Sequence, residues 1–336
     1  MESFLQRMSK RLARMEQLPL LLSFVFICIV IGLLSEKFFT VANWMNVFRA
    51  ASLIAIPAIG MVSLILLGEI DLSIGSLSAL AGVAGVVVMN ITDNFTLGML
   101  TALLTGIVAG LLNSVVVVYG KVNSLIATLG MMAILRGFVM VFTNAKSIQA
   151  LDTRFVDFGA GSVLGFLPKP FVILIILFLI VAFTLSRTEI GRNIYAIGGN
   201  KSAAQLSGLP IKSITIGVFV FVSTLAGLSG FISASRMSSG QPNSGIGMEF
   251  QVVSAVILGG VSLSGGKGTI YGAMIGVLIL GVLSNGLILL NISSFWQDIV
   301  RGFVIILAVF IDEFRKQRLA NRTFRDAARQ ISAEGE

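Results

Sequence analysis

Long runs of uncharged apolar residues recur along the whole chain. Residues 18–34 and 97–118, for example, contain no Asp, Glu, Lys or Arg. A run of about 18 or more such residues is long enough to cross a bilayer as a helix. Hydrophobic residues make up 56% of the 336 residues and charged residues only 12%, which is too apolar for an ordinary soluble domain. The sequence therefore predicts an all-α integral membrane protein.

We expect about ten transmembrane helices. The predicted spans are 18–34, 50–67, 72–89, 97–118, 123–142, 171–186, 213–234, 250–263, 270–290 and 297–312. The run 250–263 is short for a complete span, which indicates a broken or re-entrant helix. The first run lacks a small-x-small cleavage site, so we interpret it as an uncleaved span and not as a signal peptide.

The basic residues cluster beside apolar runs. The clusters lie at 7–14, at 187–212 and beyond 314, in a chain whose net charge is +8. An excess of Lys and Arg beside a span marks the cytoplasmic side of a membrane. Ten spans place all three clusters and both termini on that side. The charge therefore reports orientation, and we expect no nucleic-acid partner.

Three regions follow from this topology. Residues 1–17 form a basic amphipathic segment at the cytoplasmic membrane surface, 18–312 a single transmembrane domain with a cytoplasmic loop at 187–212, and 313–336 a basic cytoplasmic tail. The longest segment expected outside is 143–170. It is either a docking surface for an outside partner or a plain connector.

The residue inventory excludes several kinds of chemistry. The chain has no His and a single Cys, Cys28, which lies in the first apolar run. An internal disulfide, a His-ligated metal and a Ser-His-Asp triad are therefore excluded, and we expect no catalytic and no metal site. The stretch "SGGKGT" (264–269) departs from a phosphate-binding loop, because Val261 stands where the first Gly belongs and Gly268 follows Lys267. No nucleotide-binding domain surrounds it.

The stretch "GEIDLSIGS" (68–76) places two acids, Glu69 and Asp71, between two apolar runs. An ionised group at bilayer depth costs at least ~2.5–3.5 kcal/mol, so its retention needs a compensating interaction. In one interpretation Asp71 or Ser73 caps the helix that begins near residue 72. In the other, a helix break between Gly68 and Gly75 exposes polar groups to solute in a transport pathway. Residues two apart point to different faces, which disfavours a site shared by the two acids.

Other polar residues interrupt the predicted spans. Asn113 and Asn285 either form hydrogen bonds between helices or line a cavity. Arg136 and Arg301 are either functional residues of the membrane interior or are explained by snorkelling or an internal ion pair. Two similarities, "LGEIDLSIG" (67–75) with "LGGVSLSGG" (258–266) and "RGFV" at 136–139 and 301–304, indicate an inverted internal repeat or chance resemblance.

A short helix is predicted within the basic loop, at "NKSAAQLSG" (200–208). Asn200 or Ser202 suits its N-cap, and Gly208 suits its C-cap just before Pro210. The interior residues include Ala203, Ala204 and Leu206. A capped short helix with a small-residue surface suits docking into a partner's groove, and the alternative is a plain connector.

Four blocks of the sequence carry a resemblance to a known family. They are "GEIDLSIGS", "ATLGMMAILRG" (127–137), "GRNIYAIGGNKSAAQLSG" (191–208) and "AVILGGVSLSGGKGTIYGAMIGVLILGVLSNGL" (255–287). In this order they resemble the membrane permease subunits of bacterial ABC importers for ribose and related monosaccharides, over about residues 35–312. Glu69 departs from the Gly-Ile-Asp spelling typical of the family, whereas Asp71 and Ser73 follow the pattern.

The resemblance implies partners that the chain itself does not contain. Such permeases act as a pair, commonly a homodimer, in the bacterial inner membrane. A periplasmic or extracellular binding protein delivers the sugar, and a cytoplasmic ATPase binds ATP and Mg, so no cofactor is expected in this chain. Residues 198–208, beginning at Gly198 and Gly199, would form the segment that couples the permease to the ATPase.

The expected function is therefore ATP-driven import of a monosaccharide or related polyol by a subunit that is not itself an enzyme. The alternative is an ion-coupled secondary transporter or channel, in which Glu69 and Asp71 would relay protons or cations. The energy source distinguishes the two.

Overall fold

The computed structural model describes residues 17–293, 295–297, 299–300, 302–303, 306 and 310. Nearly all of the predicted N-terminal segment 1–17, much of the predicted span 297–312 and the whole tail 313–336 lie outside these residues. Asp298 and Arg301 lie outside them as well.

Seven described helices are long and apolar enough to cross a membrane. They are α3 (Val41–Leu66), α4 (Ile74–Thr92), α5 (Phe95–Val118), α6 (Ser124–Thr143), α8 (Lys169–Arg187), α11 (Ile211–Arg236) and α13 (Ile270–Leu289). Two shorter apolar helices are α2 (Leu18–Leu34) and α12 (Met248–Leu258). The predicted helical, multi-span architecture is confirmed, whereas the number of ten spans remains a prediction.

The second span begins earlier than the sequence suggests. The sequence predicts a span at 50–67, but α3 starts at Val41. Asn43 interrupts the apolar pattern, and its amide is satisfied by tertiary partners: Asn43 Nδ2 donates to the backbone carbonyl of Phe38 and to Asn285 Oδ1. Thr40 caps the helix by accepting a hydrogen bond from Asn43 N.

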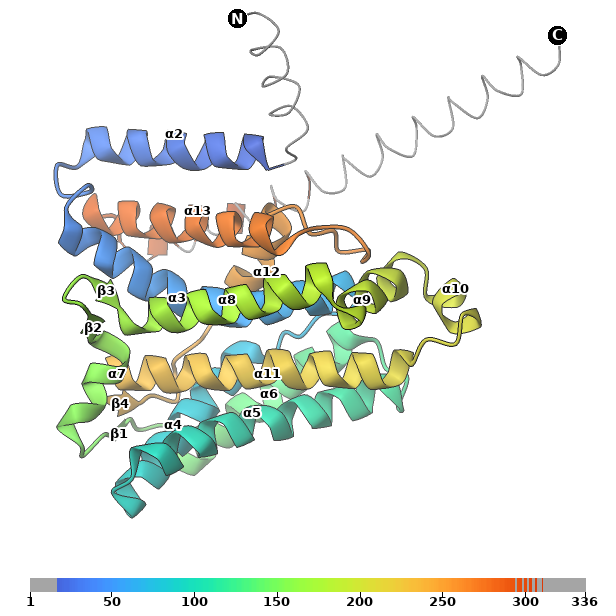
Figure 1. Cartoon of the computed structure of the whole chain (residues 1–336). Coiled ribbons are helices and arrows are strands. Elements are labelled where there is room, and N and C mark those ends of the chain that lie inside the picture. Colours follow the sequence, from blue (N-terminus) through green and yellow to red (C-terminus); the bar gives the residue numbers. More distant parts are fainter. Residues whose placement is uncertain are drawn as a thin grey trace, which may run out of the picture.

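The long helices lie side by side, with different small elements at the two ends of the bundle (Figure 1). At one end lie α9 (Glu189–Gly199) and α10 (Lys201–Leu206). The other end carries β1 (Ile148–Gln149), η1 (Thr153–Phe155), α7 (Val156–Ala160), β2 (Ser162–Val163), β3 (Leu167–Pro168) and β4 (Ser239–Gly240). Antiparallel pairing of β1 with β4 joins the loop 143–170 to the segment after α11.

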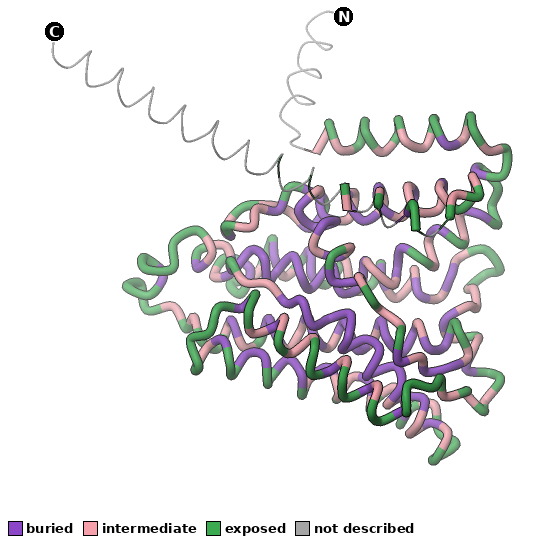
Figure 2. The backbone as a smooth tube through the Cα atoms, turned by 180° about the vertical axis from the view of Figure 1, so that it is seen from behind, coloured by how far each residue is buried: buried purple, intermediate pink, exposed green. Residues whose placement is uncertain are grey.

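Helix α11 lies at the centre of the packing and contacts α3, α4 and α5. Glycines allow this close approach. A Cβ on Gly230 would overlap the carbonyl oxygen of Ser78, and one on Gly227 would lie 2.6 Å from the carbonyl oxygen of Ala102. The buried backbone accordingly concentrates in the middle of the bundle (Figure 2).

Large apolar side chains cover the outer faces. On α6 they include Phe138 and Val141, which are 59% and 79% exposed. Water-exposed apolar surface of this extent would be unfavourable. A lipid or protein environment around the bundle removes that cost.

Candidate functional site

Asp71 lies in the non-helical segment between α3 and α4 and is completely buried. Its Oδ1 accepts hydrogen bonds from Ser73 N at 2.8 Å and Ser73 Oγ at 2.6 Å. Its Oδ2 accepts from Asn113 Nδ2 at 3.2 Å and from Ser223 Oγ at 3.3 Å. Both carboxylate oxygens therefore have partners, from the segment itself and from α5 and α11.

The structure divides the predicted capping role, because Asp71 Oδ1 accepts a hydrogen bond from Ser73 N at the start of the helix, whereas the Ser73 side chain caps nothing. Helix α4 begins at Ile74 with Ser73 as its N-cap residue, but the Ser73 side chain accepts no hydrogen bond from the first turn. Ser73 has helical backbone angles, whereas a capping residue normally adopts extended ones. The Asp71 carboxylate also binds Ser73 Oγ and the neighbouring helices α5 and α11.

The backbone of the same segment is bound by α6. Ser124 Oγ accepts a hydrogen bond from Ile70 N at 3.2 Å, and Thr128 Oγ1 accepts one from Leu72 N at 3.0 Å. Gly68 has φ +81°, a conformation that ends α3 and that a side chain would disfavour. The predicted helix break is therefore present and has specific partners for its backbone.

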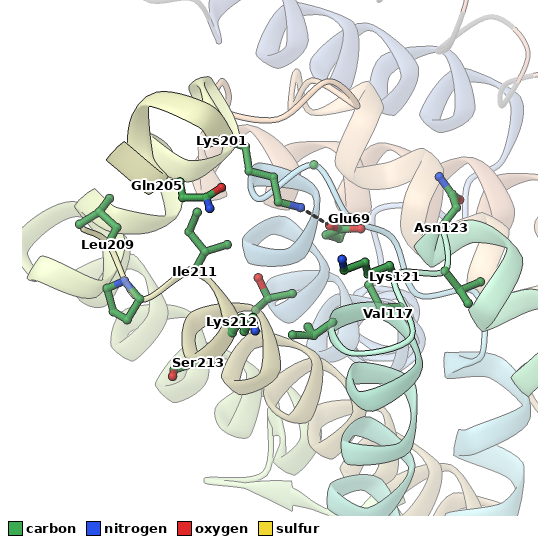
Figure 3. A pocket seen from close by; sticks show the side chains of 15 residues that line it. Glu69, Val117, Lys121, Asn123, Lys201, Gln205, Leu209, Ile211, Lys212 and Ser213 are labelled. Atoms are coloured by element: carbon green, nitrogen blue, oxygen red, sulfur yellow. Dashed lines mark hydrogen bonds and ion pairs between the residues drawn. The ribbon is translucent and has the colours of Figure 1, made fainter. Parts of the chain in front are cut away.

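Glu69 points away from Asp71, as the two-residue spacing predicts. Its Oε1 lies 3.3 Å from Lys201 Nζ, the first residue of α10. The pair spans a cavity of about 870 Å³ between α10 and the bundle (Figure 3). Two further lysines, Lys121 and Lys212, line this cavity.

The predicted short helix is confirmed as α10. Asn200 Oδ1 accepts a hydrogen bond from Ala203 N at 2.9 Å, so Asn200 and not Ser202 is the capping side chain. The C-cap is Ser207, and Gly208 follows with φ +75°. Ala204 is buried, whereas Leu206 is 91% exposed.

The loop before α10 contains a helix that the sequence interpretation missed. In α9, Thr188 caps the first turn, and Gly191, Ile194 and Ile197 are buried. Their spacing of three residues is the signal of a helix with one apolar face. The glycines at 198 and 199 obscured it, because glycine normally disfavours helices.

Three distant sequence blocks meet at the end of α9. Gly266 N donates a hydrogen bond to the carbonyl oxygen of Leu66 at 2.8 Å. A Cβ on Gly198 would overlap that same carbonyl and would lie 2.7 Å from Gly266 N. Tyr195 Oη donates to the carbonyl oxygen of Gly268 at 2.9 Å. The end of α3, the end of α9 and the turn that contains Gly266 and Gly268 thus form one junction, in which backbone packs against backbone.

Asn285 forms a reciprocal amide pair with Asn43. Asn285 Nδ2 donates to Asn43 Oδ1 at 2.9 Å, and Asn43 Nδ2 donates to Asn285 Oδ1 at 3.0 Å. The sequence predicts that Asn113 and Asn285 each either form hydrogen bonds between helices or line a cavity. Both side chains form hydrogen bonds to other elements. Neither residue lines the cavity of Figure 3.

The sequence matches the family described as "Branched-chain amino acid transport system / permease component" over residues 43–309. It is 45% identical to the ribose import permease protein of Escherichia coli K12 over 302 residues, which cover 89% of this chain and 94% of the relative. It is 38% identical to the L-arabinose ABC transporter permease protein of Azospirillum brasilense, covering 88% and 87% of the two chains. The ribose import permease protein of Bacillus subtilis is also 38% identical, covering 89% and 93%. No solved structure matches.

The chain belongs to this family of ABC importer permease components. It is accordingly a multi-pass protein of the bacterial inner membrane and a transport subunit without enzymatic activity of its own.

Within the permease, sequence reasoning missed two buried polar residues that the fold brings to predicted site residues. Ser223 of α11 binds Asp71, and Glu249 of α12 contacts Gly75. Serine in an apolar helix carries no distinctive signal, because it often bonds its own backbone. Glu249 is detectable as an isolated acid at the start of the short run 250–263.

Proposed function

We propose that this permease is the membrane-spanning subunit of an ATP-driven importer of a monosaccharide. The observation that carries the proposal is the similarity, over nearly the whole chain, to permeases named for ribose and L-arabinose. An uncharged sugar needs hydrogen-bonding groups and no counter-charge, which suits a chain with few ionisable residues in its spans. The family description names branched-chain amino acids, and these are the competing cargo.

The partners in this proposal supply what the permease lacks. A second copy of the chain completes a central pathway, a binding protein delivers the sugar from outside, and a cytoplasmic ATPase binds ATP and Mg. The lysine- and arginine-rich segments, including both termini, face the cytoplasm. Residues 1–17, 18–312 and 313–336 serve as surface segment, transmembrane domain and cytoplasmic tail.

The α9–α10 unit (residues 189–206) is the proposed contact with the ATPase. Its exposed Leu206 suits insertion into an apolar groove of a partner. The junction at Gly198 joins the unit to the end of α3, which leads directly into the segment that holds Asp71. A displacement of α9 by the ATPase would therefore act on the break between α3 and α4, where Asp71 and Ser73 lie, and on Gly75 at the start of α4.

Reconstitution tests the proposal. The permease, with its partner ATPase and binding protein, is placed in liposomes loaded with ATP, and uptake of labelled ribose, arabinose and leucine is measured. We expect sugar uptake that requires ATP and the binding protein. Uptake that persists without ATP and collapses with an ion gradient would favour the secondary transporter, and leucine uptake alone would overturn the sugar assignment.

A further inference from the structure

The first turns of two helices meet inside the bundle. Gly75 is the second residue of α4, and Glu249 is the second residue of α12. A Cβ on Gly75 would overlap both Glu249 Oε2 and the carbonyl oxygen of Gly245. The segment before α12 packs against α4, because a Cβ on Gly240 would lie 2.8 Å from the Val83 Cα. The contact at Gly75 therefore lies where two helices begin within the packed protein.

Glu249 is a buried acid with an incomplete set of partners. It lies in the first turn of α12, where backbone N–H groups have no partner within the helix. The residue is only 5% exposed, yet its Oε2 has no hydrogen-bond donor within the part of the chain that the structure describes. Leaving a buried polar group unpaired is unfavourable, and more so when the group is charged. Such atoms are rare in native proteins and require an explanation.

An arginine from a third helix completes the cluster. Arg136 of α6 donates hydrogen bonds from Nη1 to the carbonyl oxygens of Ser244, at 2.9 Å, and Pro242. It also interacts electrostatically with Glu249. The segment 242–249 thus ends in an acid and binds a cation from α6. The donors on Arg136 Nε and Nη2 are used by no described hydrogen bond.

We propose that Glu249 is a hydroxyl-binding residue for the transported sugar, and that Oε2 accepts a hydrogen bond from a sugar hydroxyl when α4 and the segment 242–249 separate. This inference rests on the proposed function. Charge-assisted hydrogen bonds are about twice as strong as neutral ones, so a carboxylate is an effective acceptor for a neutral polyol. The helix N-terminus of α12 stabilises the carboxylate while the site is empty.

The closed contact explains how the site is kept from water. Gly75 lies directly against Oε2 in this structure. Gly75 belongs to α4, and the segment before α4 begins after Leu66 of α3. The Leu66 carbonyl packs against Gly198 of α9. Movement of that unit can therefore change access to Oε2. Discontinuous helices whose ends meet near a substrate site are a common solution in membrane transporters.

The test compares wild type with Glu249→Gln in the reconstituted importer, using D-ribose and its monodeoxy analogues. Gln keeps the size of Glu but presents an amide, so it binds one hydroxyl less strongly. We expect ribose uptake to fall at least tenfold, whereas uptake of the one analogue that lacks the bound hydroxyl falls much less. Both variants receive sugar from the same binding protein, so the selectivity of that protein cancels in the comparison.

Two outcomes would overturn the proposal. An equal reduction for ribose and every analogue would mean that Glu249 only stabilises α12, and unchanged uptake would also overturn the assignment. Should Glu249→Gln yield no folded protein, Glu249→Asp is assayed in the same way, because it keeps the charge but withdraws the acceptor by one methylene. The exposed acid Glu36, changed to Gln, is the control and should leave all rates unaltered. Absence of ATP-dependent sugar uptake in wild type would instead refute the proposed function.

Discussion

Asp71, in the break between α3 and α4, is bound by Asn113 of α5, whose Nδ2 lies 3.2 Å from Asp71 Oδ2. The other hydrogen of the same amide is directed at Ser73 Oγ, at 2.9 Å. Both donors of Asn113 are therefore used on one short segment. This relationship makes Asp71 a connection between elements and distinguishes it from Glu69, which faces the cavity beside α10.

Replacing Asp71 by Asn should destabilise the permease. The new amide would direct a donor at the donor of Asn113, and a lost buried hydrogen bond of this kind costs about 1–3 kcal/mol. We expect a lower thermal unfolding midpoint in detergent and reduced transport. Asp71→Ala should also lower the folded yield.

Exchange of the two side chains provides a sharper check on this contact. Asp71→Asn combined with Asn113→Asp again places one donor opposite one acceptor, so part of the lost stability should return. The exposed Asp93→Asn change serves as the control. If the Asp71→Asn protein were as stable as wild type, the hydrogen bonds of Asp71 to Asn113 and Ser223 would not stabilise the fold.

Gly198 should not tolerate a side chain, whereas its neighbour Gly199 should. A Cβ at 198 would overlap the carbonyl oxygen of Leu66, but one at 199 would meet nothing within 4 Å. Overpacking of this kind typically costs about 1–3 kcal/mol. Gly198→Ala should therefore reduce folded yield or the sugar transported per ATP hydrolysed, and Gly199→Ala should change neither. Similar behaviour of the two variants would argue against the junction.

Helix α11 offers a second matched pair of glycines. A Cβ on Gly230 would overlap the Ser78 carbonyl of α4, while Gly217 has open space around it. We expect Gly230→Ala to lower the temperature at which the detergent-solubilised protein aggregates, because α4 and α11 must move apart. Gly217→Ala should match or slightly exceed wild type, since alanine favours helix. A higher aggregation temperature for Gly230→Ala than for Gly217→Ala would refute this packing.

The amide pair of Asn43 and Asn285 should behave as a coupled unit. Asn285→Leu alone leaves the Asn43 Oδ1 unpaired inside the bundle, at a cost of about 1–3 kcal/mol. The double change Asn43→Leu with Asn285→Leu removes both polar groups and should recover part of that loss. A double-mutant cycle on unfolding free energies measures the coupling. Simple additivity of the two single changes would show that the pair contributes nothing specific.

Local patterns in the sequence were enough to predict the class of this protein. Repeated apolar runs, a helix break at "GEIDLSIGS" and a capped short helix at 200–208 are local patterns, and each depends on residues close together in the chain. The apolar length of a span and the cap of α10 could be predicted because backbone hydrogen bonds within a helix need only near neighbours. The family blocks then pointed to an importer permease.

The tertiary structure alone decided what the polar residues contact. Asp71 is satisfied by Asn113 and Ser223, which are 42 and 152 positions away along the chain. The early start of α3 depends in the same way on Asn43 meeting Asn285, 242 positions later. A buried polar group is stable wherever a complementary group is brought to it, and only the packing of distant helices against one another determines which group that is.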